Sequence, residues 1–388
     1  MSPVNEATHK STTANTSTHL INYSNDATHE HAPFLDCQGR SINYLRISLT
    51  DRCNLRCVYC MPEEGVCPLK HDDILSLEEV EHFVRIAANK GIQHIRLTGG
   101  EPLVRKGIYS LIQKLKRIPQ IESIALTTNG ILLPKMAKEL KNSGLDRVNI
   151  SLDSLDPDQY RAITRLGKLE DALAGVDAAL DYFSPVKINV VAIRHLQQDL
   201  LSFARMTLDR PLHVRFIEYM PIGNTQEYYP PAIKFSSKDE RQTACIDSGH
   251  IPWSKQDIIP ASEILERLKR DAEREKIGEI IAFDPAIKNP SFGQGPASYI
   301  KIKGAQGSIG FISAMSDHFC SSCNRIRLTA DRKIRPCLFS DKELDIKTAL
   351  RTGTDAEIEN ILDETLRIKP KNHESIAGTK RNMNKIGG

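Results

Sequence analysis

Residues 49–60 read LTDRCNLRCVYC and follow the first predicted strand, residues 44–49. Three cysteines, Cys53, Cys57 and Cys60, are spaced C-x3-C-x2-C within this stretch. Three thiolates on one tight loop can hold three irons of a four-iron, four-sulfur (4Fe-4S) cluster and leave the fourth iron open for a small chelating ligand. A zinc site is the alternative, but zinc ligands usually come in two separated pairs, and this stretch carries an odd third cysteine and no histidine. The spacing therefore favours an iron–sulfur cluster.

Around this loop, short β-branched or apolar runs alternate with segments of helical character. Candidate strands are residues 44–49, 94–98, 124–128, 147–152, 187–193 and 213–219. Ser76 and Glu79 form a capping-box signal at the start of one helix, and residues 134–144 and 169–183 read as two more. Alternation of this kind implies α/β architecture with a parallel sheet and right-handed crossovers. About six βα units predict a partial, open TIM-type barrel with its site at the carboxyl ends of the strands.

Length and charge limit the remaining possibilities. At roughly 150 residues per domain, 388 residues correspond to two or three domains. We expect a disordered tail (1–33), a partial barrel (34–223), a polar insertion (224–260) and a smaller C-terminal lobe (261–388). The formal net charge of +3 is too balanced for wholesale nucleic-acid binding. No apolar run reaches the roughly 18 residues of a membrane helix, so we expect neither nucleic acid nor a membrane as partner.

The number of cysteines indicates how they are used. Nine is an odd number, and no signal-peptide pattern precedes them, which argues against a secreted disulfide framework. Reduced thiols that bind metal fit better, and we expect a cytoplasmic protein, with the mitochondrial matrix as the alternative. Cys37, Cys67 and Cys245 match no motif, and we interpret them as bystanders.

A second group of cysteines, Cys320, Cys323 and Cys337, lies in the C-terminal part. It again offers three thiolates and no fourth, which suggests a second cluster with one open iron, although nearby His318 keeps zinc as an alternative. Between these cysteines, Arg325 and Arg327 are two residues apart on a predicted strand and therefore share one face. Two guanidinium groups beside such a site suggest a clamp for phosphate oxygens.

These features together resemble a known family. The cysteine loop, with aromatic Tyr59 before its last cysteine, and the segment TGGEP at residues 98–102 are similar to the cluster loop and glycine-rich segment of radical S-adenosylmethionine (SAM) enzymes. The paired arginines and the C-terminal Gly387 and Gly388 narrow the resemblance to the GTP 3′,8-cyclase family of molybdenum cofactor biosynthesis. The resemblance covers nearly the whole chain from about residue 39.

The resemblance implies two 4Fe-4S clusters and S-adenosyl-L-methionine as cofactors, and a role for several residues. Clusters are expected on Cys53, Cys57 and Cys60 and on Cys320, Cys323 and Cys337. Positions that match cosubstrate contacts are Tyr59, Gly100, Ser151 and Met220. Positions that match GTP contacts are Arg46, Arg96, Thr127, Lys187, Arg215, Arg325 and Arg327. Arg325 and Arg327 are also the expected catalytic residues, which assist a late reduction and protonation step.

The implied activity is that of a radical SAM lyase that converts GTP to 3′,8-cyclo-7,8-dihydroguanosine 5′-triphosphate. Implied partners are an electron donor and cyclic pyranopterin monophosphate synthase, which would use the product, and a homodimer is compatible with the resemblance. Two other readings stay open: another radical SAM enzyme with an auxiliary cluster, and a non-catalytic zinc-binding scaffold. His94 departs from the family pattern, which often has lysine there, and the tail and the insertion have no counterpart in the short bacterial pattern.

Overall fold

The computed structural model describes residues 33–70, 72–222, 255–282, 295–374, 379 and 381–387. Cys245, Gly388 and nearly all of the predicted tail and insertion lie outside these residues. Ala32–Gly388 forms one compact unit. The proposed division into a barrel, an insertion and a C-terminal lobe stays a prediction.

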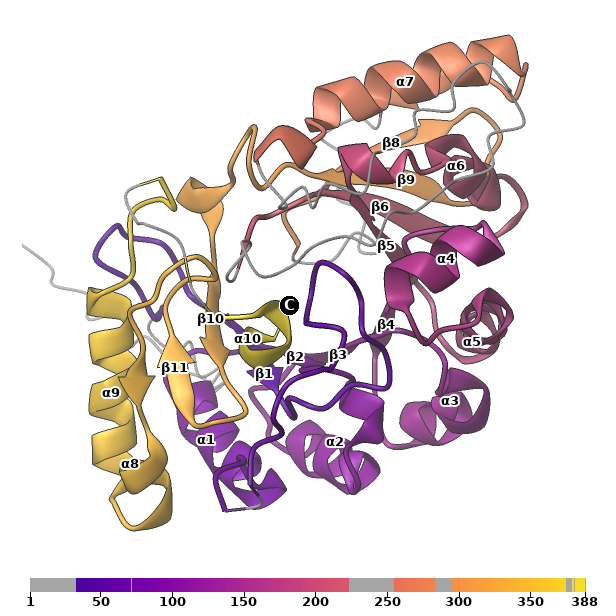
Figure 1. Cartoon of the computed structure of the whole chain (residues 1–388). Coiled ribbons are helices and arrows are strands. Elements are labelled where there is room, and N and C mark those ends of the chain that lie inside the picture. The colour runs from indigo at the N-terminus through magenta and orange to yellow at the C-terminus, as the bar shows by residue number, and fades with distance from the viewer. Residues whose placement is uncertain are drawn as a thin grey trace, which may run out of the picture. The chain divides into compact units, whose positions relative to one another are not determined.

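One continuous sheet of twelve strands dominates the described part of the chain (Figure 1). Its spatial order is β12-β11-β10-β1-β2-β3-β4-β5-β6-β9-β8-β7. The strands are β1 (Tyr44–Ser48), β2 (His94–Thr98), β3 (Ser123–Thr128), β4 (Arg147–Ser151), β5 (Val186–Ala192), β6 (Leu212–Glu218), β7 (Ile280–Ala282), β8 (Ser298–Ile302), β9 (Ser308–Ile312), β10 (Arg325–Leu328), β11 (Lys333–Arg335) and β12 (Leu344–Asp345).

The predicted fold class is confirmed. Strands β1 to β6 pair in sequence order, all parallel, and each lies within one residue of its predicted bounds. The sheet is open, because β1 and β6 pair outward with strands from the C-terminal part. Strand β10 pairs parallel with β1, and β9 pairs parallel with β6. The strands of the C-terminal part are thus divided between the two ends of the barrel sheet (Figure 1).

The described helices are α1 (Leu77–Asn89), α2 (Ile108–Lys116), α3 (Leu133–Asn142), α4 (Pro157–Thr164), α5 (Leu169–Tyr182), α6 (Leu200–Asp209), α7 (Ala261–Arg274), α8 (Lys347–Arg351), α9 (Asp355–Arg367) and α10 (Met383–Ile386). Helices α1 to α6 connect the parallel strands and lie outside the curved sheet, whereas α10 lies in front of β1 and β10 (Figure 1). The capping box predicted for α1 is present: Ser76 accepts from the backbone of Glu79, and the Glu79 carboxylate accepts from the backbone of Ser76. None of the described helices is long and apolar enough to cross a membrane.

The parallel strands alternate between apolar and polar residues. In β1, Leu45 and Ile47 are fully buried in the core, whereas Tyr44, Arg46 and Ser48 lie on the other face. Strands of a parallel sheet that is packed on both faces usually read as continuous apolar runs. Alternation here means that helices cover one face and that the inner face is a polar surface able to line a site.

Helix α5 packs closely against the loop that enters α3. A Cβ atom on Gly175 would lie 2.2 Å from the carbonyl oxygen of Gly130, so only glycine fits at this crossing. Gly175→Ala should therefore lower the free energy of unfolding by about 1–3 kcal/mol through overpacking, measured by chemical denaturation. Helix propensity alone would instead raise it by up to about 1 kcal/mol.

The exposed neighbour Ala174 supplies the control. Ala174→Gly should cost about 1 kcal/mol from propensity alone. A stabilised Gly175→Ala variant would show that α5 does not approach Gly130 this closely.

Candidate active site on the inner face of the sheet

Four arginines lie at one end of the inner face. Arg46 on β1 is paired in register with Arg96 on β2 and with Arg327 on β10. Arg325 precedes Arg327 by two residues and therefore points to the same side. Three neighbouring strands thus bring guanidinium groups from distant parts of the sequence side by side, as the predicted substrate contacts require.

The remaining predicted substrate contacts continue along this face. The Thr127 hydroxyl accepts from Arg96 at 3.2 Å. In register, Thr127 lies opposite Asn149, and Asn149 lies opposite Lys187. In the orientation that pairs donors with acceptors, the Asn149 amide oxygen accepts from both Arg96 and Arg215. All seven predicted positions therefore lie on one face of one sheet.

Crowding of like charge is the main electrostatic feature of this face. Burial, followed by the cations Arg215, Arg147 and Arg96, lowers the pKa of Lys187 to about 6. Burial and neighbouring arginines also hold the pKa of Arg46 well below its usual range. An anion bound among these groups would relieve their mutual repulsion. The face is therefore suited to a polyanion such as a triphosphate.

Neutral acceptors that the sequence analysis missed hold the guanidinium groups in place. Arg96 Nε donates to Tyr44 Oη at 2.7 Å, and Arg215 donates to Asn189 Oδ1 through Nη2 at 2.6 Å and Nε at 3.0 Å. Burial raises the pKa of Tyr44, but Arg96 and Arg46 together bring it below its usual value. The signal that could have revealed Tyr44 and Asn189 is the polar residue at every second position of these strands.

The first cysteine group lies on the loop between β1 and α1. Cys60 N donates to the Cys57 carbonyl at 2.9 Å, and Leu55 N donates to Cys53 Sγ at 3.4 Å. Burial raises the pKa of Cys53 to about 11 and that of Cys60 to about 12, and Cys53 adds to the shift of Cys60. Burial and Cys60 likewise raise the pKa of Cys57 well above its usual value.

The raised pKa values of these three thiols are consistent with a role as ligands of a metal cluster. These three half-buried thiols have raised pKa values, which neighbouring thiols raise further at Cys57 and Cys60, so they are costly to ionise alone. Metal ions, in contrast, ionise coordinating thiols outright. Three sulfur donors on one loop, near the carboxyl end of a barrel strand, match the ligand set of a cluster with one open iron. The donor chemistry therefore supports the predicted first cluster site.

Tyr59 is positioned by a buried carboxylate. Its hydroxyl donates to Asp153 Oδ2 at 2.5 Å, and Asp153 Oδ1 accepts from Val191 N at 2.8 Å. Burial raises the pKa of Asp153 to about 6. Ser151 ends β4 two residues before Asp153, and Met220 follows β6, and both are half-buried. The predicted cosubstrate positions thus lie at or just beyond the carboxyl ends of several strands.

Gly100 has a packing role in addition to the predicted one. Its N–H donates to the Thr50 carbonyl at 2.7 Å, and a Cβ atom would lie 2.2 Å from the Arg52 carbonyl oxygen. Glu101 N donates to the Arg52 carbonyl at 2.8 Å. The glycine-rich segment therefore docks directly on the backbone that leads into Cys53, and this close approach requires glycine.

The C-terminal tail reaches the arginine cluster. Figure 1 shows α10 in front of β1 and β10, with the chain end beside it. Arg327 Nη1 donates to the Gly387 carbonyl, and a Cβ atom on Gly387 (φ +71°) would lie 2.8 Å from Thr98. Asn384 is buried and donates to the Asp51 carbonyl at 3.2 Å. The tail that composition alone would class as frayed is packed between the cysteine loop and the arginines.

The second cysteine group surrounds the start of β10. Cys320 and Cys323 belong to a short 3-10 turn before the strand, and Cys337 follows β11. The buried Lys369 ammonium donates to Cys323 Sγ at 3.7 Å and to the carbonyls of Arg325 and Pro336 at 2.8 and 2.7 Å. Burial raises the pKa of Cys323, but Lys369 and Arg325 bring it below its usual value. These cations therefore favour the thiolate form of Cys323, which is the form that binds metal.

Other residues noted in the sequence lie apart from these groups. Cys37 and Cys67 are exposed, consistent with bystander thiols. His94, at the amino end of β2, is buried and lies 3.0 Å from Ser123 Oγ through Nδ1. Burial lowers its pKa. It shares the inner face with Arg96 but lies one row away, toward the amino ends of the strands.

Comparisons with known proteins find matching family models and similar curated enzymes. Residues 47–206 match the radical SAM superfamily, and residues 245–375 match the family described as Molybdenum Cofactor Synthesis C. The chain is 47% identical to the GTP 3′,8-cyclase of Pelotomaculum thermopropionicum over 358 residues, which span 91% of this chain and 99% of that protein. It is 46% identical to the enzyme of the same name from Moorella thermoacetica over 359 residues, with 91% and 99% coverage.

Solved structures with the same fold are more distant. Streptococcus suis SuiB bound to S-adenosylmethionine aligns with a TM-score of 0.50 at 14% identity, over 84% of this chain and 68% of that chain. Native anSMEcpe with bound AdoMet aligns with a TM-score of 0.50 at 15% identity, over 86% and 82%. At such identities these structures support the fold alone.

The low pKa of Lys187 predicts proton-linked anion binding. A bound polyanion favours the charged amine, so the pKa of Lys187 should rise from about 6 when inorganic triphosphate binds. Above pH 6 binding should therefore take up a proton, and affinity should fall roughly tenfold per pH unit until the pKa of the complex is passed. Calorimetry in two buffers of different ionisation enthalpy measures the uptake.

Lys187→Met provides the comparison, because it keeps the chain length and removes the titrating group. This variant should bind more weakly at pH 6 and lose the proton uptake. Equal proton uptake by the variant would assign the linkage to another group.

Proposed function

The chain belongs to the GTP 3′,8-cyclase family of the radical SAM superfamily, and from this membership we propose that it converts GTP to 3′,8-cyclo-7,8-dihydroguanosine 5′-triphosphate. This reaction is the first step of molybdenum cofactor biosynthesis, and the enzyme is a lyase. One observation carries the proposal: seven predicted substrate positions share the inner face of a sheet whose strand ends hold the cysteine loop.

We assign the first iron–sulfur cluster to Cys53, Cys57 and Cys60. When bound, the cluster and S-adenosylmethionine supply the radical that removes the ribose C3′ hydrogen of GTP, after which C3′ can bond to guanine C8. The chain holds the reactants in place around this chemistry. Tyr59, Gly100, Ser151 and Met220 would contact the cosubstrate, and the hydrogen bond from Tyr59 to Asp153 fixes the aromatic ring beside the cysteines.

The inner-face cations would bind the triphosphate. Guanidinium forks match phosphate oxygens, and the acceptors Tyr44, Thr127 and Asn189 already orient Arg96 and Arg215. Binding at several points fixes the ribose and base relative to one another, and orientation of this kind can lower a reaction barrier by several kcal/mol. Arg325 and Arg327 lie nearest the second cysteine group, where they would also assist the late reduction and protonation step.

We assign a second 4Fe-4S cluster to Cys320, Cys323 and Cys337. The cationic surroundings support this proposal, since Lys369, Arg325 and Arg40 all favour the ionised thiol of Cys323. The cluster's open iron would hold the guanine edge, next to the arginines on β10. We further propose an electron donor and cyclic pyranopterin monophosphate synthase as functional partners, and a cytoplasmic location.

Loss of the arginine pair should abolish product formation. In Arg325→Ala with Arg327→Ala, removal of two charge-assisted contacts, each worth about 1.5–3 kcal/mol, should weaken GTP binding at least about hundredfold. Cyclised product is measured by chromatography, GTP affinity by calorimetry, and iron content should stay unchanged. Arg85→Ala, which removes an exposed arginine on α1, is the matched control and should behave as the wild type. Normal cyclisation by the double variant would refute the clamp.

Iron content tests the second cluster separately. Anaerobic reconstitution should give about eight irons per chain, four for each cysteine group. Replacing Cys320, Cys323 and Cys337 by serine should leave about four irons, and so should the same change at Cys53, Cys57 and Cys60. About four irons in the wild-type chain would contradict the second cluster without affecting the assignment of the first.

A further inference from the structure

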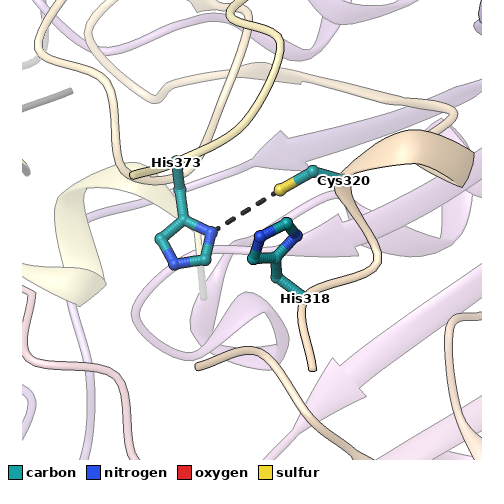
Figure 2. A group of neighbouring side chains, drawn as sticks. All are labelled: His318, Cys320 and His373. Carbon is teal, nitrogen blue, oxygen red and sulfur yellow. Dashed lines mark hydrogen bonds between the residues drawn. The ribbon is translucent and has the colours of Figure 1, made fainter. Parts of the chain in front are cut away.

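A group of three side chains beside the second cysteine group includes only one of its cysteines. His318, Cys320 and His373 each offer a ligand atom, and these atoms all lie within 4.8 Å of one another. Figure 2 shows the two imidazole rings beside the Cys320 sulfur. The Cys320 Sγ and His373 Nδ1 atoms are 3.5 Å apart.

This separation is that of two ligands on one tetrahedral ion. Zinc binds sulfur at about 2.3 Å and imidazole nitrogen at about 2.05 Å, which places the two atoms about 3.5 Å apart at the tetrahedral angle. Two histidines and one thiolate are common zinc donors, and three protein ligands leave the fourth position for water. The separation of Cys320 Sγ and His373 Nδ1 therefore suits two ligands of one metal ion, and the His318 ligand atom lies within 4.8 Å of both.

The surrounding structure holds these donors together across the sequence. The buried guanidinium of Arg40 donates through Nη1 to the carbonyls of Cys320 at 2.8 Å and Lys371 at 3.1 Å, and through Nη2 to that of Pro370 at 2.8 Å. One side chain thus ties the loop of Cys320 to the segment of His373. The His373 ring also stacks on Phe339, with centroids 4.8 Å apart. Such support fixes ligands before metal arrives.

The His318 ring also supplies an unsatisfied ligand atom. His318 Nδ1 is buried and has no hydrogen-bond partner among the described residues. A buried polar atom of this kind is unfavourable by itself, and coordination to a metal ion would satisfy it. His318 Nε2 lies 3.7 Å from Glu374 Oε2, so a carboxylate lies beside the ring at a distance too long for a direct hydrogen bond.

We propose that His318, Cys320 and His373 form a site for one thiophilic divalent ion, such as Zn²⁺, in the chain that lacks the second cluster. The ion and the cluster exclude each other, because both need the sulfur of Cys320. This exclusion rests on the proposed second cluster, whereas the metal site itself does not. A bound ion would keep Cys320 from oxidation and hold its loop to the His373 segment until iron and sulfide arrive.

Cobalt is a direct probe, because Co²⁺ adopts zinc geometry and its thiolate complexes absorb in the near ultraviolet and visible range. The full chain with Cys53, Cys57 and Cys60 replaced by serine is prepared free of iron, so that the first cysteine group cannot bind cobalt. It should bind one Co²⁺ with a thiolate-to-cobalt band and tetrahedral visible bands. Absence of the thiolate band in this chain overturns the proposal.

Variants in the same background identify the ligands. His318→Phe and His373→Phe keep an aromatic ring and should each weaken Co²⁺ binding at least about hundredfold, since loss of partners that only orient a ligand already costs ten- to hundredfold. Cys320→Ser should remove the thiolate band. Cys337→Ser should leave the spectrum unchanged, as should the control His82→Ala on α1, where His82 pairs with Asp355. A spectrum lost in Cys337→Ser but kept in both histidine variants overturns the proposal in favour of a three-cysteine site.

Discussion

Mutual repulsion among buried cations on the inner face of the parallel sheet is the constraint on which the rest of the structure depends. Two unit charges 5 Å apart still interact by roughly 3 kcal/mol at an effective dielectric constant of 20, and this face holds several. Burial first, and then the neighbouring arginines, lower the pKa of Lys187 to about 6, so repulsion adds to the cost of burying this charge. Such an arrangement of cations persists only when a rigid scaffold prevents the side chains from moving apart. A bound anion would relieve their mutual repulsion.

The alternation of apolar and polar residues along the strands provides this rigid scaffold. Because every second residue of β1 to β6 is apolar and faces the helices, one sheet supplies both the core and the site. The neutral acceptors Tyr44, Asn149 and Asn189 hold the guanidinium groups without cancelling their charge. At the strand ends, burial raises the pKa of Cys57 and of Asp153, so these acidic groups are costly to ionise unless a metal ion binds. The inner face is thus suited to a polyanion, and the adjacent strand ends are suited to metal ions.

Much of this arrangement could be predicted from the sequence, and the failures have physical causes. The six barrel strands were placed within one residue because each is a short segment of alternating apolar and polar residues between clear breaks. Helix α9 was missed although Thr354 and Glu357 form a capping box, and α2 was missed because it begins at Gly107 without a side-chain cap. The pairing of β10 with β1 could not be foreseen, since no local pattern links segments about 280 residues apart. The roles of Tyr44 and Asn189 depend on the register of β1 with β2 and of β5 with β6, although the polar residue at every second position of these strands was a signal for both.

The tail contact explains how the face is kept ready for substrate. An acidic residue in place of Gly387 would neutralise Arg327 and compete with an incoming phosphate. The Gly387 carbonyl instead accepts one hydrogen bond from Arg327 and carries no net charge. It therefore fixes the guanidinium while leaving the positive potential nearly intact, the same solution that Tyr44 provides for Arg96. Glycine is required there because the close approach to Thr98 leaves no room for a side chain.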